Sequence, residues 1–274
     1  MNKIKLVATD IDGTLISSNM QLSEKNREAL DYCVKNGIKI VAATGRTFET
    51  IPEYLREYEG IEYLVCANGS AVYSGYPRKL LHTFCLSPEA IKYVDEIIKH
   101  PTIVTELSCE GAQYTTEENI ERLSKFDISE NVLNYIKATR TVVDSVVSLA
   151  EDKIDKIEQI SFCFSQEDEK QYLYEKLSQS DLYVLTSAWS FNYEIIDHKA
   201  GKGNGVSYIC GLNNISSDEV LAIGNNDNDV DMLDFAGVAV AVEDSTTAAL
   251  EAADFIAKPC KEDGFAEAIH KFVI

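Results

Sequence analysis

Apolar and polar residues follow a repeating pattern along the chain. Apolar runs with little alternation occupy residues 4–9, 38–43, 61–67 and 219–223. Such runs are typical of strands that are covered on both faces. Between them, apolar residues recur at helical spacing, as in a helix expected to be capped by Ser23, to reach Lys35 and to end at Gly37. Strands that alternate with helices predict βαβ units and a parallel sheet.

Other helices and strands continue this alternation at both ends of the chain. After residue 43, a helix is expected to carry Phe48, Ile51, Leu55 and Tyr58 on one face. From Lys202 onward the pattern predicts a helix over 205–210, a strand at 238–240 and a closing helix over 263–272. The two outer parts of the chain are therefore expected to complete one sheet.

The middle of the chain has a different pattern. Ser87-Pro88 begins a predicted helix, and short strands and helices follow at 102–108, 111–115, 156–165 and 168–178. No glycine-rich loop or acid pair follows a strand in this block. We expect an α/β protein with a doubly wound parallel-sheet core, residues 1–83 and 189–274, and an inserted α/β module, residues 84–188.

An alternating stripe opens the second part of the predicted core. Trp189, Phe191, Tyr193 and Ile195 occupy every second position. This period of two predicts that all four side chains lie on the inner face of one strand, where they pack in the core of a sheet.

Charge and composition narrow the class of protein. The formal net charge of -20 argues against nucleic acid as a partner, because phosphate backbones require basic surfaces. No apolar run approaches the ~20 residues of a membrane span, and no signal-peptide pattern is visible, so we expect a cytoplasmic protein without a membrane partner. Seven scattered cysteines favour free thiols. We expect a monomer or a weak homo-oligomer.

Polar clusters follow the ends of the predicted strands. Asp10 and Asp12 follow the first strand, with Gly13 permitting a sharp turn. The other clusters are Thr44-Gly45-Arg46, Asn68-Gly69-Ser70 and Gly224-Asn225-Asn226-Asp227-Asn228-Asp229. Ligands of open α/β sheets bind at the carboxyl ends of the strands, so these clusters are placed for chemistry. Taken alone, Asp-Gly is also common in turns that cap a helix.

These residue types suit phosphoryl transfer. An aspartate can attack phosphorus, and a second carboxylate can protonate the leaving oxygen and then activate water. The Thr44 hydroxyl and the backbone amides of Gly45 and Arg46 can donate to phosphate oxygens, and Lys202 can add a positive charge. An isolated lysine is more often a solvated surface residue. Mg²⁺ would complete such a site, with the acid cluster near Asp229 contributing.

Four motifs together resemble a known family. They are Asp10-Ile11-Asp12-Gly13-Thr14, Ala43-Thr44-Gly45-Arg46, Lys202-Gly203 and Gly224-Asn225-Asn226-Asp227-Asn228-Asp229. In order and spacing, the chain resembles the haloacid dehalogenase (HAD) superfamily, specifically the Cof-type phosphatases with a class IIB cap. The resemblance spans the whole length, and it implies a Rossmann-like catalytic core with the inserted module as the cap.

The resemblance also implies roles for single residues. Asp10 would be the nucleophile and a metal ligand, and Asp12 would be the general acid/base, with its backbone carbonyl on Mg²⁺. Thr44 and Lys202 would hold the transferring phosphate. The implied metal ligands are Asp10, Asp12, Asn225 and Asp229. The implied substrate-binding residues are Gly45, Arg46, Asn68, Gly69 and Asn228. An acid at position 12 separates this chain from the dehalogenases and the P-type ATPases of the superfamily.

One position departs from the family pattern. The fourth motif of the family usually reads Gly-Asp-x-x-Asn-Asp, and this chain has Asn225 where the first aspartate binds the metal. An amide offers one neutral oxygen, whereas Mg²⁺ prefers charged oxygen, so we expect weaker metal binding. Asp227 and Asp229 could compensate for the lost charge.

The function expected from these observations is an Mg²⁺-dependent phosphatase. It would hydrolyse a small phosphorylated metabolite through an aspartyl-phosphate. Two alternatives stay open: a catalytically weak protein that binds or senses a phosphometabolite, because of Asn225, and a sugar phosphomutase. Sugar phosphates, pyridoxal phosphate and flavin mononucleotide are all chemically allowed, and nothing in residues 84–188 selects among them. The cap aromatics Tyr114 and Tyr135 could touch a sugar or a base, although packing in the cap is the role we expect for them.

Overall fold

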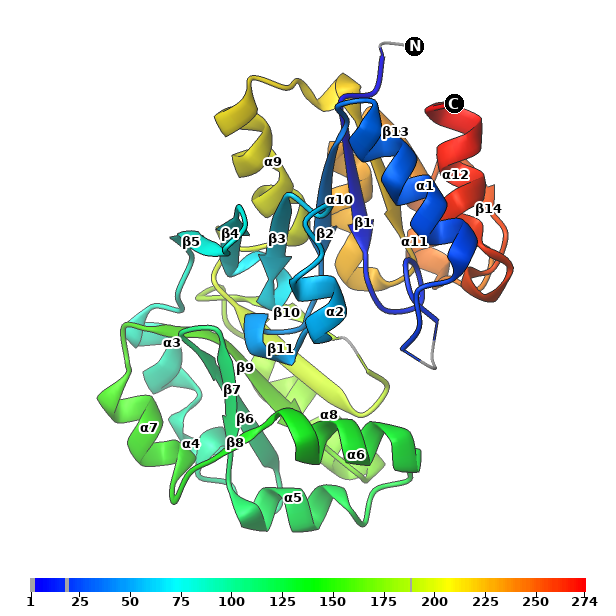
Figure 1. The fold of residues 1–274 in the computed structure, drawn as a ribbon. Helices are drawn as coiled ribbons and strands as arrows, with labels where there is room; N and C mark the ends of the chain where they lie inside the picture. The colour runs from blue at the N-terminus through cyan, green and yellow to red at the C-terminus, as the bar shows by residue number, and fades with distance from the viewer. Residues whose placement is uncertain (1–2, 18–19, 188) are drawn as a thin grey trace. The chain divides into compact units, whose positions relative to one another are not determined.

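The computed structural model describes residues 3–17, 20–187 and 189–274, and the chain forms two compact units (Figure 1). The first unit contains residues 1–45, 51–82 and 200–274. The second contains residues 46–50 and 83–199. A mixed α/β fold in which one module is inserted into a parallel-sheet core is confirmed.

In the described part of the first unit, eight strands form one sheet in the order β14-β13-β12-β1-β2-β3-β4-β5. Each neighbouring pair from β14 to β3 is parallel, and β4 runs antiparallel to β3. The strands are β1 (Leu6–Asp10), β2 (Lys39–Ala43), β3 (Tyr63–Cys66), β4 (Ala71–Ser74), β5 (Lys79–Thr83), β12 (Val220–Gly224), β13 (Val238–Val242) and β14 (Phe255–Ala257). Strands β1, β12 and β13 are buried at every position, as expected for strands covered on both faces.

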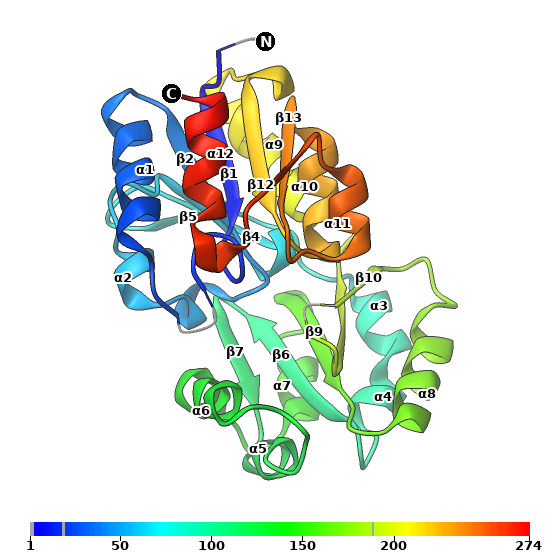
Figure 2. The same cartoon turned by 90° about the vertical axis from the view of Figure 1, so that its right-hand side faces the viewer.

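Helices cover both faces of this sheet (Figure 2). One face packs against α9 (Lys202–Asn213), α10 (Val230–Phe235) and α11 (Thr247–Ala252), where Leu6 and Ala8 of β1 join one apolar cluster. The other face carries α1 (Glu24–Lys35) and α12 (Gly264–Phe272). Helix α1 begins as predicted, because the Ser23 hydroxyl accepts a hydrogen bond from the Asn26 amide at 3.1 Å.

The second unit is built on an antiparallel sheet. In the order β10-β11-β9-β6-β7-β8, its described strands are β6 (Val104–Cys109), β7 (Ala112–Thr115), β8 (Thr141–Val142), β9 (Ile157–Cys163), β10 (Val184–Thr186) and β11 (Asn192–Ile196). Neighbouring strands of this sheet are antiparallel except β7 and β8, which are parallel. Its helices are α3 (Pro88–Tyr93), α4 (Asp95–Ile98), α5 (Glu117–Leu123), α6 (Glu130–Thr139), α7 (Val146–Asp152) and α8 (Glu167–Leu177).

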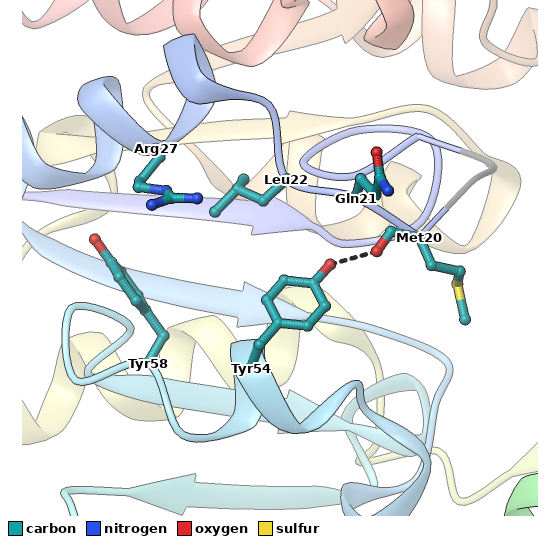
Figure 3. A pocket seen from close by; sticks show the side chains of 6 residues that line it. All are labelled: Met20, Gln21, Leu22, Arg27, Tyr54 and Tyr58. Carbon is teal, nitrogen blue, oxygen red and sulfur yellow. Dashed lines mark hydrogen bonds between the residues drawn. The ribbon is translucent and has the colours of Figure 1, made fainter.

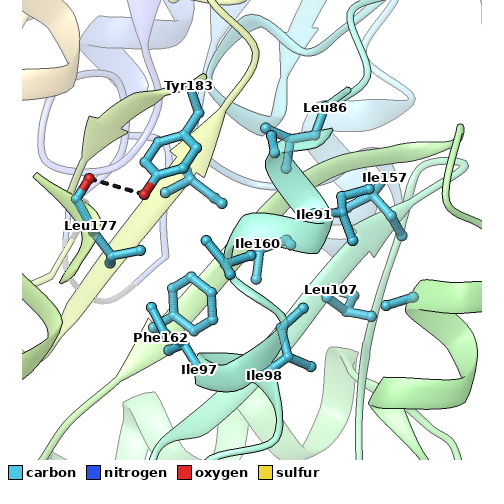
Figure 4. Close-up of a cluster of buried hydrophobic side chains, with 14 of the residues drawn as sticks. Leu86, Ile91, Ile97, Ile98, Leu107, Ile157, Ile160, Phe162, Leu177 and Tyr183 are labelled. Carbon is cyan, nitrogen blue, oxygen red and sulfur yellow. Dashed lines mark hydrogen bonds between the residues drawn. The ribbon is translucent and has the colours of Figure 1, made fainter. Parts of the chain in front are cut away.

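The two faces of this second sheet differ in chemistry. Leu107, Ile160 and Phe162 lie in a cluster with apolar side chains of α3, α4, α7 and α8 (Figure 4). On the opposite face, Val104 and Cys163 pack against α5 and α6. Polar side chains of β6, β7, β9 and β11 that follow the same alternation are also buried, among them Glu106, Gln113, Ser161 and Glu194. Hydrogen bonds between these side chains compensate for part of the cost of burying them.

The unit boundaries differ from the predicted ones in two places. Strand β11 pairs with β9, so residues 189–199 lie in the second unit and not in the parallel-sheet core. Residues 46–50 also belong to the second unit, although the chain on both sides belongs to the first. The division of labour into a catalytic core and a cap stays a prediction.

Two local predictions were wrong. The single helix expected to carry Phe48 through Tyr58 is instead a short 3₁₀ turn, η1 (Phe48–Thr50), and a separate helix α2 (Glu53–Arg56). Pro52, the N-cap residue of α2, accounts for the break, because proline restricts the residue before it to extended backbone. In the 189–196 stripe, Tyr193 and Ile195 contact the cluster of Figure 4, whereas Trp189 and Phe191 precede β11 and pack on the opposite face.

No helix among the described residues has both the length and the apolar character that crossing a membrane requires.

Candidate active site

The sheet register brings three predicted clusters to one edge of the first unit. Strand β1 lies between β2 and β12 and is parallel to both. Asp10 is paired with Ala43, the residue before Thr44, and Thr9 is paired with Ile223, two residues before Asn225. The carboxyl ends of the three strands therefore place Asp10 between the second and fourth motifs, as the pattern predicted.

Lys202 brings a positive charge to this edge of the sheet. It is the first residue of α9, and only 1% of its surface is exposed. Its Nζ donates to Asp10 Oδ1 at 2.7 Å and to Asp229 Oδ1 at 2.5 Å. Burial lowers the pKa of Lys202, but the carboxylates of Asp10 and Asp229 more than offset this and raise it above its ordinary value. Lys202 is therefore a buried ammonium ion and not a solvated surface lysine.

Asp10 has one oxygen that is not engaged by hydrogen bonds. Its Oδ2 is buried and has no hydrogen-bond partner among the described residues. Burial raises the pKa of Asp10 to about 7, Lys202 opposes that shift, and Asp229 and Asp12 add to it. A buried carboxylate oxygen without a partner is costly for folding alone, so it marks a place where a ligand or a cation would fit.

The turn after Asp10 brings the first and fourth motifs into close contact. Gly13 has a φ of 87°, and a Cβ at this position would lie 2.6 Å from Nδ2 of Asn225. Asp12 precedes this glycine and is exposed, whereas Thr14 is buried. The Thr14 hydroxyl donates to Asn225 Oδ1 at 3.1 Å. Glycine therefore allows the turn and the close approach of the Asn225 amide without backbone strain.

Asp229 is fully engaged within the motif that contains it. Its Oδ1 accepts from Lys202, and its Oδ2 accepts from the backbone amides of Asn225 and Asn226, both at 2.9 Å. These bonds fold the strand-end loop around a buried carboxylate. Asp229 thereby positions both Lys202 and Asn225, and its predicted role as a metal ligand stays a prediction.

The donor set fits a magnesium ion only in part. Mg²⁺ is commonly held in proteins by one or two carboxylates, with water and phosphate oxygens completing its shell. Asp10 Oδ2 offers one anionic oxygen, and Asn225 Oδ1 offers a neutral one that already accepts from Thr14. Within the described ranges, no three His, Cys, Asp or Glu side chains are grouped so that they could hold a metal. The residues fit Mg²⁺ with fewer charged oxygens than the usual motif supplies.

The loop after β3 also lies at this edge of the sheet and contacts the second and fourth motifs. Three successive residues, Ala67, Asn68 and Gly69, have positive φ values of 48°, 51° and 93°. The Asn68 amide donates to the Thr44 carbonyl at 3.0 Å, and Asn68 Oδ1 accepts from Asn228 Nδ2 at 2.8 Å. This strained backbone thus joins the second and fourth motifs, and such strain is concentrated at functional sites.

Asp231 is a part of this edge that sequence reasoning missed. Its Oδ2 accepts from the Gly203 amide at 2.8 Å, at the start of α9. A carboxylate at a helix N-terminus stabilises the unpaired amides there, so Asp231 holds the turn that carries Lys202. An acid two residues after Asp229 is the sole sequence sign of this role.

Arg46 is assigned to a different unit from the strand-end residues. It belongs to the second unit, where its Nη1 donates to the Thr50 carbonyl at 3.0 Å and its guanidinium carbon lies 4.3 Å from the ring centroid of Tyr135. Its predicted contact with the substrate is not tested by these interactions and stays a prediction, as do those of Gly45, Asn68, Gly69 and Asn228.

A separate cavity of about 510 Å³ lies in the first unit (Figure 3). It is lined by Met20, Gln21, Leu22, Arg27, Tyr54 and Tyr58. The Tyr54 hydroxyl donates to the Met20 carbonyl at 2.7 Å, and the Tyr58 hydroxyl donates to Asp31. No predicted site residue lines this cavity, so the strand-end cluster is the candidate active site.

Comparison with known proteins covers nearly the whole chain. The family model of haloacid dehalogenase-like hydrolases matches residues 7–269. YxeH of Bacillus subtilis (strain 168) is 28% identical over 98% of this chain and 98% of its own length. YcsE of the same organism, named a 5-amino-6-(5-phospho-D-ribitylamino)uracil phosphatase, is 24% identical over 99% of this chain and 96% of its own length.

Solved structures show the same fold. A haloacid dehalogenase-like hydrolase from B. subtilis has a TM-score of 0.83 at 24% identity, covering 97% of this chain and 99% of that protein. A HAD subclass IIB sugar phosphatase has a TM-score of 0.83 at 21% identity, covering 98% of this chain and 100% of that protein. The family resemblance drawn from the four motifs is confirmed.

Proposed function

Because the chain belongs to the haloacid dehalogenase-like hydrolases and is a phosphatase of that family, we propose that it hydrolyses a small phosphorylated metabolite through an aspartyl-phosphate on Asp10. The observation that carries this proposal is the buried Lys202, whose ammonium group contacts Asp10 Oδ1 while Asp10 Oδ2 has no partner among the described residues. A carboxylate held beside a fixed cation suits attack on an anionic phosphate, because the cation offsets the repulsion between the two.

Chemistry proceeds in two steps. A carboxylate oxygen of Asp10 attacks phosphorus, and the bond between phosphorus and the ester oxygen breaks. Asp12 gives its proton to the leaving oxygen. In the second step Asp12 takes a proton from water, whose oxygen attacks phosphorus, so that inorganic phosphate leaves and the Asp10 carboxylate is restored. The exposure of Asp12 suits this exchange of protons with water and substrate.

Binding of the phosphoryl group falls to fixed donors. Lys202 supplies charge from the start of α9, and the Thr44 hydroxyl and Gly45 amide follow directly after β2. Because these donors are fixed by the sheet and by α9, little reorganisation is needed when charge develops on the phosphoryl oxygens. Asn68, Gly69 and Asn228 are proposed to line the same edge.

Mg²⁺ would be held by the Asp10 carboxylate and the Asp12 carbonyl, with Asn225 giving a neutral oxygen and Asp229 a carboxylate that it shares with Lys202. When bound, this ion would neutralise negative charge on the phosphoryl oxygens. Asp10 would therefore carry most of the anionic charge that the ion meets.

The substrate is proposed to be a sugar phosphate or a similar small ester. YcsE is named for a substrate whose phosphate is carried by a ribityl chain. The reacting edge of this chain would contact only the phosphoryl group and the ester oxygen of such a substrate. The neutral Asn225 favours a second candidate, a protein that binds a phosphometabolite with little turnover.

Phosphate release tests the proposal. Purified protein is incubated with para-nitrophenyl phosphate and a panel of sugar phosphates, with and without millimolar Mg²⁺, beside the Asp10→Asn variant. We expect release that depends on Mg²⁺ and is lost in the variant. Equal release by both proteins would exclude the Asp10 mechanism, and binding without release would favour the second candidate.

A further inference from the structure

A short segment of the chain joins the candidate active site to the second unit. Thr44 belongs to the first unit, where its amide donates to the Val65 carbonyl at 2.8 Å and its carbonyl accepts from the Asn68 amide at 3.0 Å. From Arg46 to Thr50 the chain belongs to the second unit, and at Ile51 it returns to the first. We call residues Arg46–Thr50 the strap. Gly45 alone separates it from the predicted phosphate donor Thr44.

Contacts with other parts of the second unit hold the strap at or near each of its ends. The Arg46 guanidinium carbon lies 4.3 Å from the ring centroid of Tyr135 on α6, within the range of a cation–π interaction. Near the other end, the Glu49 amide donates to the Gly111 carbonyl at 2.9 Å. Within the strap, Arg46 Nη1 donates to the Thr50 carbonyl at 3.0 Å. The Arg46 side chain therefore both closes the strap and contacts Tyr135.

Tyr135 is itself firmly placed. The guanidinium carbon of Arg140 lies 5.2 Å from the centroid of the same ring. Arg140 donates from Nε and Nη2 to the two oxygens of Glu106, at 2.9 and 3.0 Å, and both side chains are buried. Glu106 also accepts from Gln113 at 2.9 Å. Because Glu106 balances the charge of Arg140, two guanidinium groups can share one ring without strong repulsion.

We propose that Tyr135 is a positioning residue for phosphate binding, and that it acts through Arg46 and the strap on Thr44 and Gly45. This inference rests on the proposed role of Thr44 in holding phosphate. If phosphate binding and the contact between Arg46 and Tyr135 influence each other, the influence is reciprocal. Phosphate at Thr44 then changes the surroundings of Tyr135, and loss of the Tyr135 ring changes the affinity for phosphate.

The chain contains a natural reporter of this coupling. Trp189 is its single tryptophan, and its ring lies 6.4 Å from that of Tyr135 in an edge-on arrangement. Trp189 also belongs to the second unit, as does Tyr135. Its fluorescence therefore reports on the surroundings of Tyr135.

Inorganic phosphate titrations test the proposal. Trp189 fluorescence and calorimetry are recorded in parallel for the wild type, Tyr135→Phe, Tyr135→Leu and the control Tyr174→Leu, which alters an exposed tyrosine on α8. We expect a fluorescence change in the wild type that follows the calorimetric binding curve. Tyr135→Phe, which keeps the ring, and Tyr174→Leu should retain it. Tyr135→Leu should lose it, with phosphate affinity weaker by about fivefold.

Kinetics separate positioning from a merely structural role. With para-nitrophenyl phosphate, Tyr135→Leu should raise KM by about fivefold while kcat stays within about twofold, and Tyr135→Phe should restore KM. Should Tyr135→Leu fail to fold, Tyr135→Met decides, because methionine fills much of the same space but offers no aromatic ring to the guanidinium. That variant should also show a weaker fluorescence response.

The outcomes distinguish this inference from the proposed function. Calorimetric phosphate binding without any change of Trp189 fluorescence in the wild type, or an unchanged response and affinity in folded Tyr135→Leu, would overturn the strap coupling and leave the phosphatase proposal intact. Coupling without turnover of any ester would support the strap and contradict hydrolysis. Absence of phosphate binding would contradict both.

Discussion

Lys202 decides how much negative charge the strand-end site tolerates. Its ammonium group contacts Asp10 and Asp229, and Asp231 holds the helix turn from which it extends. One buried cation thus faces two carboxylates at hydrogen-bond distance, and a third stands at the turn. Because unpaired buried charge is costly, Lys202 allows these acids to lie close together.

Asn225 places a neutral amide where the family motif usually has a negative charge. Its replacement by aspartate gives a direct prediction. Asn225→Asp should increase the affinity for Mg²⁺ by on the order of tenfold or more, because a carboxylate ~4 Å from a cation contributes between about 1 and 4 kcal/mol, depending on the local dielectric. Calorimetric titration with MgCl₂ measures the difference without relying on turnover.

A matched control separates position from charge. Asn226→Asp makes the same charge change at the next residue, whose side chain accepts a hydrogen bond from the Asp227 amide at 3.2 Å. We expect this variant to bind Mg²⁺ nearly as the wild type does. Equal affinities for the wild type and Asn225→Asp would show that position 225 does not contact the ion.

Sequence reasoning reached some residues of the site and not others. Asp10 and Asn225 lie at the ends of buried strands, so the apolar runs that predict those strands are enough to place both residues. Lys202 stands at a helix start, and only its spacing from the other motifs pointed to it. Asp231 could not be assigned, because its role depends on a hydrogen bond to Gly203, 28 residues away in the chain, which local patterns do not encode.

At the scale of single elements, β9 carries a group that links pH to stability. Glu158 is buried, and the Gly111 amide donates to its two oxygens at 3.3 and 3.4 Å. Burial raises the pKa of Glu158 from 4.5 to about 7, the Gly111 amide opposes this shift, and Glu110 adds to it. The folded protein therefore keeps this proton at a pH where the unfolded chain has lost it.

Glu158→Gln should change how stability depends on pH. As pH rises from 4.5 to about 7, the unfolded wild type loses the proton first, so the stability that Glu158 contributes at low pH is lost. Glutamine does not ionise. The variant should therefore gain roughly 3 kcal/mol in free energy of unfolding, relative to the wild type, between about pH 4.5 and pH 8. Urea unfolding at a series of pH values measures this gain.

An exposed neighbour provides the control with the opposite sign. Hydrogen bonds from Lys153 and Lys156 lower the pKa of Glu110 to about 2, so its contribution is lost as pH falls. Glu110→Gln should not reproduce the gain at high pH. A difference between Glu158→Gln and the wild type that does not vary with pH would contradict the account of Glu158.

Helices and strands were predictable where burial of apolar side chains alone determines the local pattern. The parallel strands of the first unit are buried on both faces, and their apolar runs identify them directly. Predictions failed where tertiary contacts override a local pattern. Phe48 and Tyr58 have helical spacing, yet Pro52 and the hydrogen bond from Glu49 to Gly111 divide that segment. Trp189 and Phe191 alternate with Tyr193 but precede the strand, so they turn to the other face.

At the scale of the whole molecule, the sequence indicated one module inserted into another, and the structure has that order. The strap could not be foreseen, because a few residues without a strand or long helix have no pattern of their own. Its membership of the second unit depends on contacts with Tyr135 and Gly111, which lie far along the chain. The chain therefore passes between the units at the strap as well as at the ends of the insertion.

A covalent bond between phosphorus and Asp10 is the central step of the proposed mechanism, and one measurement tests it directly. Protein turning over a sugar phosphate with Mg²⁺ is quenched in acid, digested, and analysed by mass spectrometry. We predict that the peptide containing Asp10 gains the mass of one phosphoryl group, and that Asp10→Asn protein shows no such gain. Turnover without any phosphorylated peptide, or a phosphoryl group on another residue, would contradict the account.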